Sequence, residues 1–377
     1  MLRVADVVRR HGPSYLDRYR GSMLPGHVRA LEDIPLCRTP EMGGHLATCT
    51  QCDRTHLLYH SCRNRTCPQC GFDATSRWLR RQEELLLPVP YSHLVFTLPA
   101  ELRRLVRTHQ KVLLSVLFRA AFNSLQRLCA NPRLVGGRIG ALAVLHTWTR
   151  TLEWHPHVHM LVPGGGLDPD GRTWRSVPRR KSMFLVPVVP LAKLFRARFL
   201  HLARRALPTV PFPHVPWSKR WVVFAKPVAR GASEVLAYLG RYVHRTAMSD
   251  KAILSVEPAV TFRYRPSGEP TSRTMTLPPH EFLRRFLQHT PPKGFHRVRA
   301  FGLLHPEHRS ELRRLQLLLA PPVDTSGPPV PDRRRATCAH CSAPLRFLRR
   351  LDVIECREAL AAGHPITIAY PPRGPPP

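Results

Sequence analysis

Two histidines, His157 and His159, stand two positions apart in a short apolar run. Side chains alternate across a β-strand, so these imidazoles share one face while Val158 and Met160 point to the other. Neutral imidazole binds divalent metals well, and two on one face form half of a metal site. The alternative is a pair of solvated strand histidines in a chain that has 21 of them.

A third histidine, His146, lies on the strand expected at residues 141–148, directly before the histidine strand. Only a short connection, residues 149–154, separates the two, so an antiparallel pairing would bring His146 beside the pair as a third ligand. The alternative is a core histidine bonded to backbone, because the register of the pairing cannot be read from sequence.

Two tyrosines, Tyr238 and Tyr242, lie four residues apart on a helix expected at residues 233–245. Both hydroxyls then emerge from one helix face, with Arg241 and Arg245 as a phosphate-binding neighbourhood. Tyrosines at this spacing more often pack than react. A metal at the histidine pair would, however, neutralise a phosphate and allow in-line attack by a phenol, which is phosphoryl transfer on DNA.

Two Cys-x2-Cys pairs, Cys49 with Cys52 and Cys67 with Cys70, have the spacing of a structural zinc site. Together they would complete a closed tetrahedron without an open position for catalysis. Four further residues among the same turns could hold a second zinc ion: Cys37, His45, His60 and Cys62. Arg63 and Arg65 would place cations beside the metal, as in a small DNA-contacting module.

The segments around these residues predict an α+β fold, in which strands carry the histidines and helices cover them. Strands are expected at residues 91–98, 141–148 and 221–225, and helices at 74–86, 101–129, 191–206 and 279–288. The long helix at 101–129 has apolar residues at helical spacing and arginines opposite, so it should cover a sheet.

Charge and composition point to a polyanionic partner. Lys and Arg number 58 against 25 Asp and Glu, a formal net charge of +33, and only seven of the 58 are lysine. Arginine binds phosphate through a planar fork, so nucleic acid is favoured well ahead of an acidic membrane. Neither a signal peptide nor a membrane-spanning run is visible, which predicts a cytoplasmic protein whose ten cysteines are metal ligands or free thiols.

In combination these motifs resemble the rolling-circle transposases of the insertion-sequence ninety-one family, within the two-tyrosine HUH superfamily. The matching stretches are residues 61–70, 89–99, 146–166, 238–247 and 282–303. The resemblance implies an N-terminal zinc domain followed by an RRM-like antiparallel sheet, with Mg or Mn at the histidines. It also implies a metal-dependent single-strand endonuclease and strand transferase that forms 5′-phosphotyrosine intermediates on single-stranded or hairpin ends of a mobile element.

Two departures from the family pattern bear on zinc. Thr66 stands where relatives usually have a histidine, which weakens a second zinc site near Cys62, and the C-terminal Cys338 and Cys341, with Cys356 beyond, look like an incomplete zinc knuckle. We expect a helical and zinc-binding domain at 1–88, the catalytic domain at 89–320 and a proline- and arginine-rich linker with a loosely ordered tail at 321–377.

Two other functions are compatible with the same residues. A relaxase or replication initiator would use the same chemistry. A non-enzymatic DNA-binding zinc protein would explain the charge and the cysteines but would leave the histidines and tyrosines without a role.

Overall fold

The computed structural model describes residues 2–177, 185–215, 218–228, 246–266, 268–319 and 337–363, with residues 71–74, 76, 77, 80 and 83 described by their backbone alone. The chain forms two compact units. One unit contains Met1–Ala74, Met248–Thr290 and Thr325–Pro377, and the other contains Thr75–Ala247 and Pro291–Asp324. The domain boundaries expected at residues 88 and 320 divide the chain into consecutive segments. The first unit, in contrast, is built from three stretches that are separate in the sequence.

The second unit contains a mixed set of helices and antiparallel strands, as expected for an α+β chain. Its strands are β3 (Tyr91–Thr97), β4 (Gly140–Trp148), β5 (Trp154–Pro163), β6 (Gly165–Leu167), β7 (Trp174–Ser176), β8 (Val223–Val228) and β12 (Val298–Gly302). Its helices are α4 (Arg103–Thr108), α5 (Gln110–Cys129), α6 (Val188–Ala206) and α9 (Arg309–Leu319), together with the C-terminal part of α3 (Pro68–Glu83).

Five strands form the central sheet in the order β12-β4-β5-β3-β8. Every neighbouring pair is antiparallel, including the β4–β5 pair that the short connection between them predicts. The three middle strands are rich in β-branched, aromatic and other apolar residues and are covered on both faces, which suits the inner strands of a sheet.

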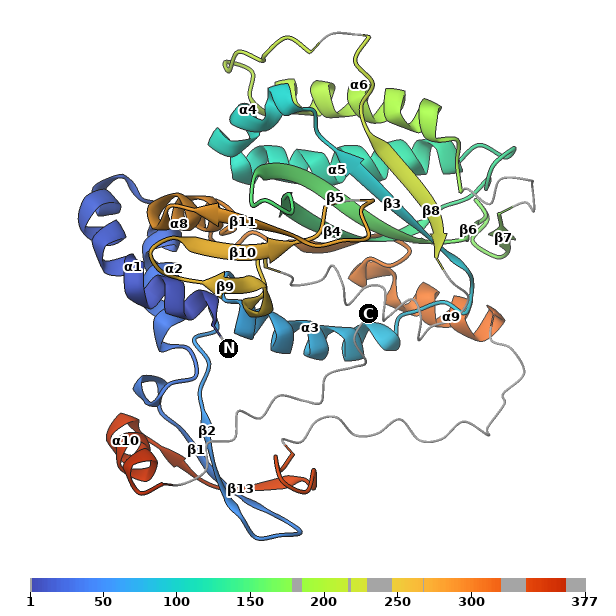
Figure 1. Cartoon of the computed structure of the whole chain (residues 1–377). Coiled ribbons are helices and arrows are strands. Elements are labelled where there is room, and N and C mark those ends of the chain that lie inside the picture. The colour runs from blue at the N-terminus through green and yellow to red at the C-terminus, as the bar shows by residue number, and fades with distance from the viewer. Residues whose placement is uncertain are drawn as a thin grey trace. The chain divides into compact units, whose positions relative to one another are not determined.

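Helices α4, α5 and α6 lie on one side of this sheet (Figure 1). The main core of the molecule fills the space between them, with Phe96, Val158 and Met160 from the strands and Phe118 and Phe195 from the helices, all fully buried. The helix expected at 101–129 is interrupted at His109, where α4 ends and α5 begins. The amphipathic pattern therefore predicts the covering role correctly but misses the break.

The opposite face of the sheet carries a smaller apolar cluster next to the histidines. Trp78, from the C-terminal part of α3, packs there with Tyr91, Leu142, Val144 and Leu161. Since alternate residues of a strand share a face, His146 on β4 and the two histidines of β5 lie on this second face. One end of the histidine face is thus covered by apolar side chains.

A glycine run directly after β5 allows the chain to turn tightly against its neighbours. A Cβ atom at Gly164 would lie 2.8 Å from the carbonyl oxygen of Pro90, and one at Gly165 would lie 2.6 Å from that of Arg175. Both distances are too short for a side chain, so these glycines are needed for close backbone packing. They begin the β6–β7 hairpin.

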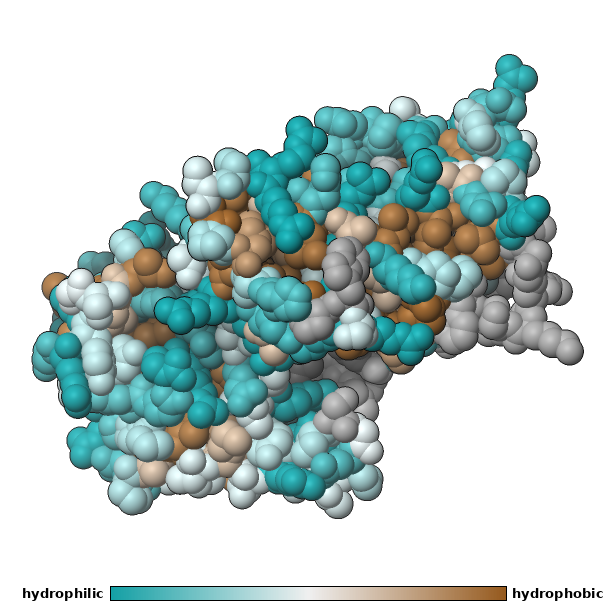
Figure 2. Space-filling view, turned by 90° about the horizontal axis from the view of Figure 1, so that it is seen from above, coloured by the Kyte–Doolittle hydropathy of each residue, from teal (hydrophilic) through white to brown (hydrophobic). Residues whose placement is uncertain are grey.

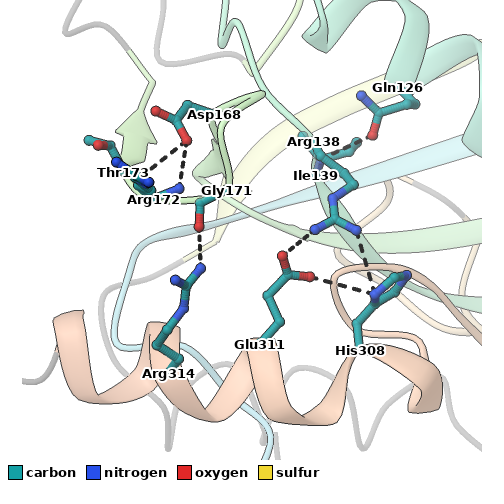
Figure 3. Close-up of polar contacts among 10 residues, drawn as sticks. All are labelled: Gln126, Arg138, Ile139, Asp168, Gly171, Arg172, Thr173, His308, Glu311 and Arg314. Carbon is teal, nitrogen blue, oxygen red and sulfur yellow. Dashed lines mark hydrogen bonds and ion pairs between the residues drawn. The ribbon is translucent and has the colours of Figure 1, made fainter.

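Helix α9 is joined to the start of β4 and to the β6–β7 hairpin by polar contacts (Figure 3). Arg138 pairs with Glu311 and lies 3.5 Å from the His308 ring, while Arg314 donates to the carbonyl of Gly171. The hairpin turn is held in place because Asp168 accepts from two backbone N–H groups. Helix α9 also buries Leu312 and Leu315.

In the first unit, α1 (Val4–Tyr19) packs against α2 (Pro25–Leu36) and α8 (Pro279–Leu287), next to a sheet in the order β11-β10-β9. These strands span β9 (Ile253–Ser255), β10 (Val260–Tyr264) and β11 (Arg273–Leu277). Asp250 accepts from the backbone of Val4 at 2.9 Å, and His11 contacts the carbonyl of Val256 at 2.8 Å. These bonds join the N-terminal helix to a segment about 245 residues away in the chain.

A second sheet of the first unit brings the two ends of the chain together. Its strand order is β13-β1-β2, with β1 (Gly44–Cys49), β2 (Thr55–Tyr59) and β13 (Leu345–Leu351), followed by α10 (Val353–Ala361). Figure 1 shows β13 and α10 beside the N-terminal hairpin. The expectation of a loosely ordered tail is therefore wrong for residues 345–361.

Hydrophilic residues dominate the face of the molecule seen in Figure 2, with apolar residues visible between them. Within the residues that the structure describes, no helix has the length and apolar character needed to cross a membrane.

Candidate active site and metal centres

Three histidines from two neighbouring strands converge on the sheet face opposite to α5 and α6. His146 of β4 is directly opposite His157 of β5, and His159 is opposite Val144. One ligand atom from each of His146, His157 and His159 lies within 4.8 Å of the others. The register thus brings together the three residues that are expected to form one site.

Hydrogen bonds orient the rings of His157 and His159. Nδ1 of His157 lies 2.7 Å from the backbone carbonyl of His155, so it must carry the proton and donate. The lone pair of that ring is then on Nε2. Nδ1 of His159 lies 2.9 Å from Nε2 of His93, and the two rings stack nearly parallel. If Nδ1 of His159 donates to His93, Nε2 of His159 is likewise available to a metal.

Burial keeps the imidazole of His157 neutral, together with those of its neighbours His93 and His155. Desolvation lowers the pKa of His157 to about 4 and that of His93 to about 3. It also lowers the pKa of His155, with a further contribution from Arg103, which donates to Nδ1 of that ring at 2.6 Å. Near neutral pH the ring of His157 therefore has the free lone pair that metal binding requires.

The donor set fits a divalent cation at an open site. Three imidazoles are fewer ligands than a closed structural site uses, so further positions remain for water or a phosphate oxygen. Trp148 stacks on His146 with 4.4 Å between ring centroids, so it covers one face of the His146 ring and limits its rotation. The site thus has rigid donors on two adjacent strands.

The tyrosines and two of the proposed DNA-binding arginines lie outside the described residues. Tyr238, Tyr242, Arg241 and Arg245 all fall in residues 229–245, so their predicted positions stay predictions. Arg63 and Arg65 are described and exposed, in the turn between Cys62 and Cys67.

The first cysteine cluster consists of Cys37, Cys62, Cys67 and Cys70, whose sulfurs lie within 4.8 Å of one another. Sγ of Cys70 is 3.6 Å from both Cys37 and Cys62. The edge of a tetrahedron with Zn–S bonds of about 2.3 Å is ~3.8 Å, so these separations suit zinc. Two backbone N–H groups, of Cys62 and Asn64, point at the sulfurs of Cys37 and Cys62 from 3.5 Å.

The structure corrects the predicted pairing of the cysteines. Cys49 and Cys52 do not join Cys67 and Cys70; they lie with Cys338 and Cys341 in a second cluster. The four residues expected to hold a second zinc ion do not stay together either. Cys37 and Cys62 complete the first cluster, whereas His45 and His60 belong to neither cysteine cluster. His60 instead contacts the carbonyl of Met42 at 3.1 Å, and its ring meets that of His45.

Interpreting the C-terminal pair as an incomplete knuckle misses the involvement of Cys338 and Cys341. Its Cys-x2-Cys spacing equals that of the two N-terminal pairs, and this was the signal available in the sequence. Spacing identifies a pair that shares one turn, but it does not say which other pair completes the tetrahedron.

Comparisons with known proteins agree with both parts of the site. The Putative transposase family matches residues 140–311, which contain the three histidines, and the Transposase zinc-binding domain matches residues 7–98, which contain the first cysteine cluster. No solved structure matches the chain significantly.

Two relatives extend over most of the chain. The chain is similar to the Putative transposase y4qJ of Sinorhizobium fredii, with 38% identity over 82% of this chain and 81% of the relative. It is also similar to the Transposase for insertion sequence element IS801 of Pseudomonas savastanoi pv. phaseolicola, with 31% identity over 75% and 72%. The chain therefore belongs to the insertion-sequence ninety-one (IS91) family of DNA-binding transposases that carry an N-terminal zinc-binding domain.

Proposed function

We propose that this transposase cleaves and rejoins single-stranded DNA through 5′-phosphotyrosine linkages during rolling-circle transposition of an insertion sequence. The observation that carries the proposal is the convergence of His146, His157 and His159 on one face of the antiparallel sheet. This sheet, with helices on its other face, is compatible with the expected RRM-like nuclease core.

The three histidines would hold a Mg or Mn ion. Such an ion, when bound, supplies positive charge beside the phosphate that is cut. The chain's own contribution is to fix the His157 and His159 rings through the carbonyl of His155 and the ring of His93, and to keep His157 neutral by burial.

Tyr238 and Tyr242 are the proposed nucleophiles. The phenol oxygen of one tyrosine forms a bond to phosphorus while the bond from phosphorus to the 3′ oxygen breaks. The phenol loses its proton and the departing 3′ oxygen takes one up, so a free 3′ hydroxyl and a 5′-phosphotyrosine result. Attack of a 3′ hydroxyl on that ester reverses the step and joins strands without a further energy source. Two tyrosines one helical turn apart would allow the donor strand and the target strand to be held in succession.

The first cysteine cluster would bind structural zinc beside the DNA-contacting turn. Cys37, Cys62, Cys67 and Cys70 surround this turn, in which Arg63 and Arg65 are exposed to solvent. Zinc binding there contributes folding free energy directly. Loss of the metal would therefore release the arginines from their defined positions.

The decisive test uses single-stranded oligonucleotides from the ends of the mobile element and detects covalent protein–DNA adducts on denaturing gels. We expect His157→Ala to reduce adduct formation by at least about 100-fold. The matched control is His201→Ala, an exposed histidine of α6, which should cleave normally.

The nucleophiles are tested in the same assay. Replacing both Tyr238 and Tyr242 by Phe should abolish the adduct, while at least one single variant still nicks. An adduct that persists in the double variant would refute the tyrosine assignment, and normal transposition by Tyr242→Phe would refute the use of two tyrosines. Excision and insertion of a marked element, rather than nicking alone, distinguishes a transposase mechanism from that of a relaxase.

A further inference from the structure

The second cysteine cluster joins two Cys-x2-Cys turns from opposite ends of the chain. Sγ of Cys49 lies 3.3 Å from Cys341, and Sγ of Cys52 lies 3.7 Å from Cys338 and 3.6 Å from Cys341. All four sulfurs lie within 4.8 Å of one another. These distances are too long for disulfides and close to the ~3.8 Å edge of a zinc tetrathiolate.

Both turns have the backbone geometry of metal knuckles. The N–H groups of Gln51 and Cys52 point at Sγ of Cys49 from 3.4 and 3.5 Å, and the N–H of His340 points at Sγ of Cys338 from 3.4 Å. Such donors stabilise a thiolate, and a thiolate is the form of cysteine that binds metal. Four free thiols without a metal would gain nothing from this convergence.

The two turns are held at the same end of one sheet. Strand β13 pairs antiparallel with β1, and the register places Cys49 opposite Leu345. Beyond the strands, Thr50 donates to the carbonyl of Pro344 through both its backbone N–H and its hydroxyl, at 3.1 and 3.0 Å. The C-terminal turn is closed by the N–H of Cys338, which donates to the carbonyl of Ala343.

Apolar packing alone provides little to hold this segment. Only the end residues of β13, Leu345 and Leu351, are buried, while Phe347 and Leu348 are 57% and 51% exposed. The cluster around the sulfurs buries few other side chains. A small module with so little core usually depends on a metal or disulfides for its stability.

We propose that Cys49, Cys52, Cys338 and Cys341 bind a second zinc ion, which fastens residues 337–363 to the N-terminal β1–β2 hairpin. This site is separate from the first cluster, and two of its ligands lie beyond the residues that match the zinc-binding family. The zinc closes the chain into a loop by joining β1 and β13, the first and last strands among the described residues. The C-terminal strand is then part of the zinc-binding fold instead of an appended tail.

The test is zinc stoichiometry in the full-length, reduced chain, measured by metal analysis. We expect two zinc ions per chain in the natural protein and one in the Cys338→Ser, Cys341→Ser double variant. The matched control is Cys356→Ser, which changes a buried cysteine of the same segment outside both clusters and should keep two ions. Hydrogen exchange of residues 345–351 should become faster in the double variant while β1–β2 amides stay protected.

A second measurement on the unaltered protein avoids any dependence on folding of a variant. In the zinc-loaded chain all four cysteines should resist alkylation, and chelation should expose them together, as detected by peptide mass spectrometry. One zinc ion in the natural protein, iron instead of zinc, or disulfides between these cysteines would each overturn the proposal. Unchanged stoichiometry in the double variant would overturn it as well.

Discussion

At the scale of single residues, the histidine site is defined as much by its supporting groups as by its ligands. The carbonyl of His155 can only accept, so it fixes the tautomer of His157. The ring of His93 does not fix the tautomer of His159 in this way, because it can either accept a hydrogen bond from His159 or donate one to it. Because His93 is buried within the sheet, it holds the His159 ring in one orientation and excludes water from that side.

We predict that His93→Phe weakens binding of the catalytic metal by about 10- to 100-fold, because the His159 ring loses the acceptor that orients it. Cleavage measured against Mn²⁺ concentration should show a higher half-saturation point, with much of the maximal rate recovered at high metal. His93→Gln restores an acceptor and should recover part of the affinity. A thermal melt of each variant separates this effect from general destabilisation, and unchanged metal affinity in His93→Phe would contradict the positioning role.

At the scale of elements, local patterns predicted the strands that carry the site. The expected strand at 91–98 and the expected helix at 191–206 are found as β3 and α6 with ends shifted by a few residues. The placement of His146 beside His157 followed from a short connection, which leaves an antiparallel hairpin as the natural arrangement. His146 and His157 are close in the sequence, so local rules are sufficient to predict that they lie side by side.

The same local rules cannot predict pairings between segments that are far apart in the sequence. The partners of Cys49 and Cys52 are about 290 residues away in the chain. By spacing alone, either of the other two Cys-x2-Cys pairs, or a pair of the single cysteines, could complete the tetrahedron. Strand β13 alternates poorly between apolar and polar residues, because most of its residues are exposed on both faces. Its pairing with β1 therefore left no periodic signal in the sequence.

The contacts of α9 in Figure 3 allow a prediction for this element. Glu311 pairs with Arg138 and lies 3.5 Å from His308. Glu311→Gln therefore removes the negative charge that both side chains contact. Because the pair is partly exposed, we expect a loss of about 1 kcal/mol or less in the free energy of unfolding. Hydrogen exchange within α9 should accelerate before that of β4.

The matched control for α9 is Glu307→Gln. The side chain of Glu307 is 81% exposed and meets only the His305 ring among the ion pairs of the described residues. Denaturant titration of both variants gives the comparison. Equal effects of the two substitutions would show that the Arg138 contact does not hold α9 against the sheet.

At the scale of the whole molecule, a net charge of +33 is the dominant property. Acidic partners neutralise only some of the arginines, as in the exposed pairs of Arg20 with Glu32 and Arg357 with Glu41. The remaining excess of positive charge attracts a polyanion and supplies affinity that does not depend on DNA sequence. Catalytic metal binding and DNA affinity should therefore be separable properties of this transposase.

We predict that affinity for single-stranded DNA falls by at least about 100-fold between roughly 50 and 200 mM salt, since each neutralised phosphate releases counterions on binding. His157→Ala and His159→Ala should keep both the affinity and its salt dependence while losing cleavage, because arginines and not the histidines neutralise the phosphates. Replacing both Arg63 and Arg65 by Ala should make the dependence shallower, by about 0.7 in the logarithmic slope per lost contact. Fluorescence anisotropy over a salt series measures all three. A weak salt dependence, or a parallel loss of binding and cleavage in the histidine variants, would instead place the DNA affinity at the metal site itself.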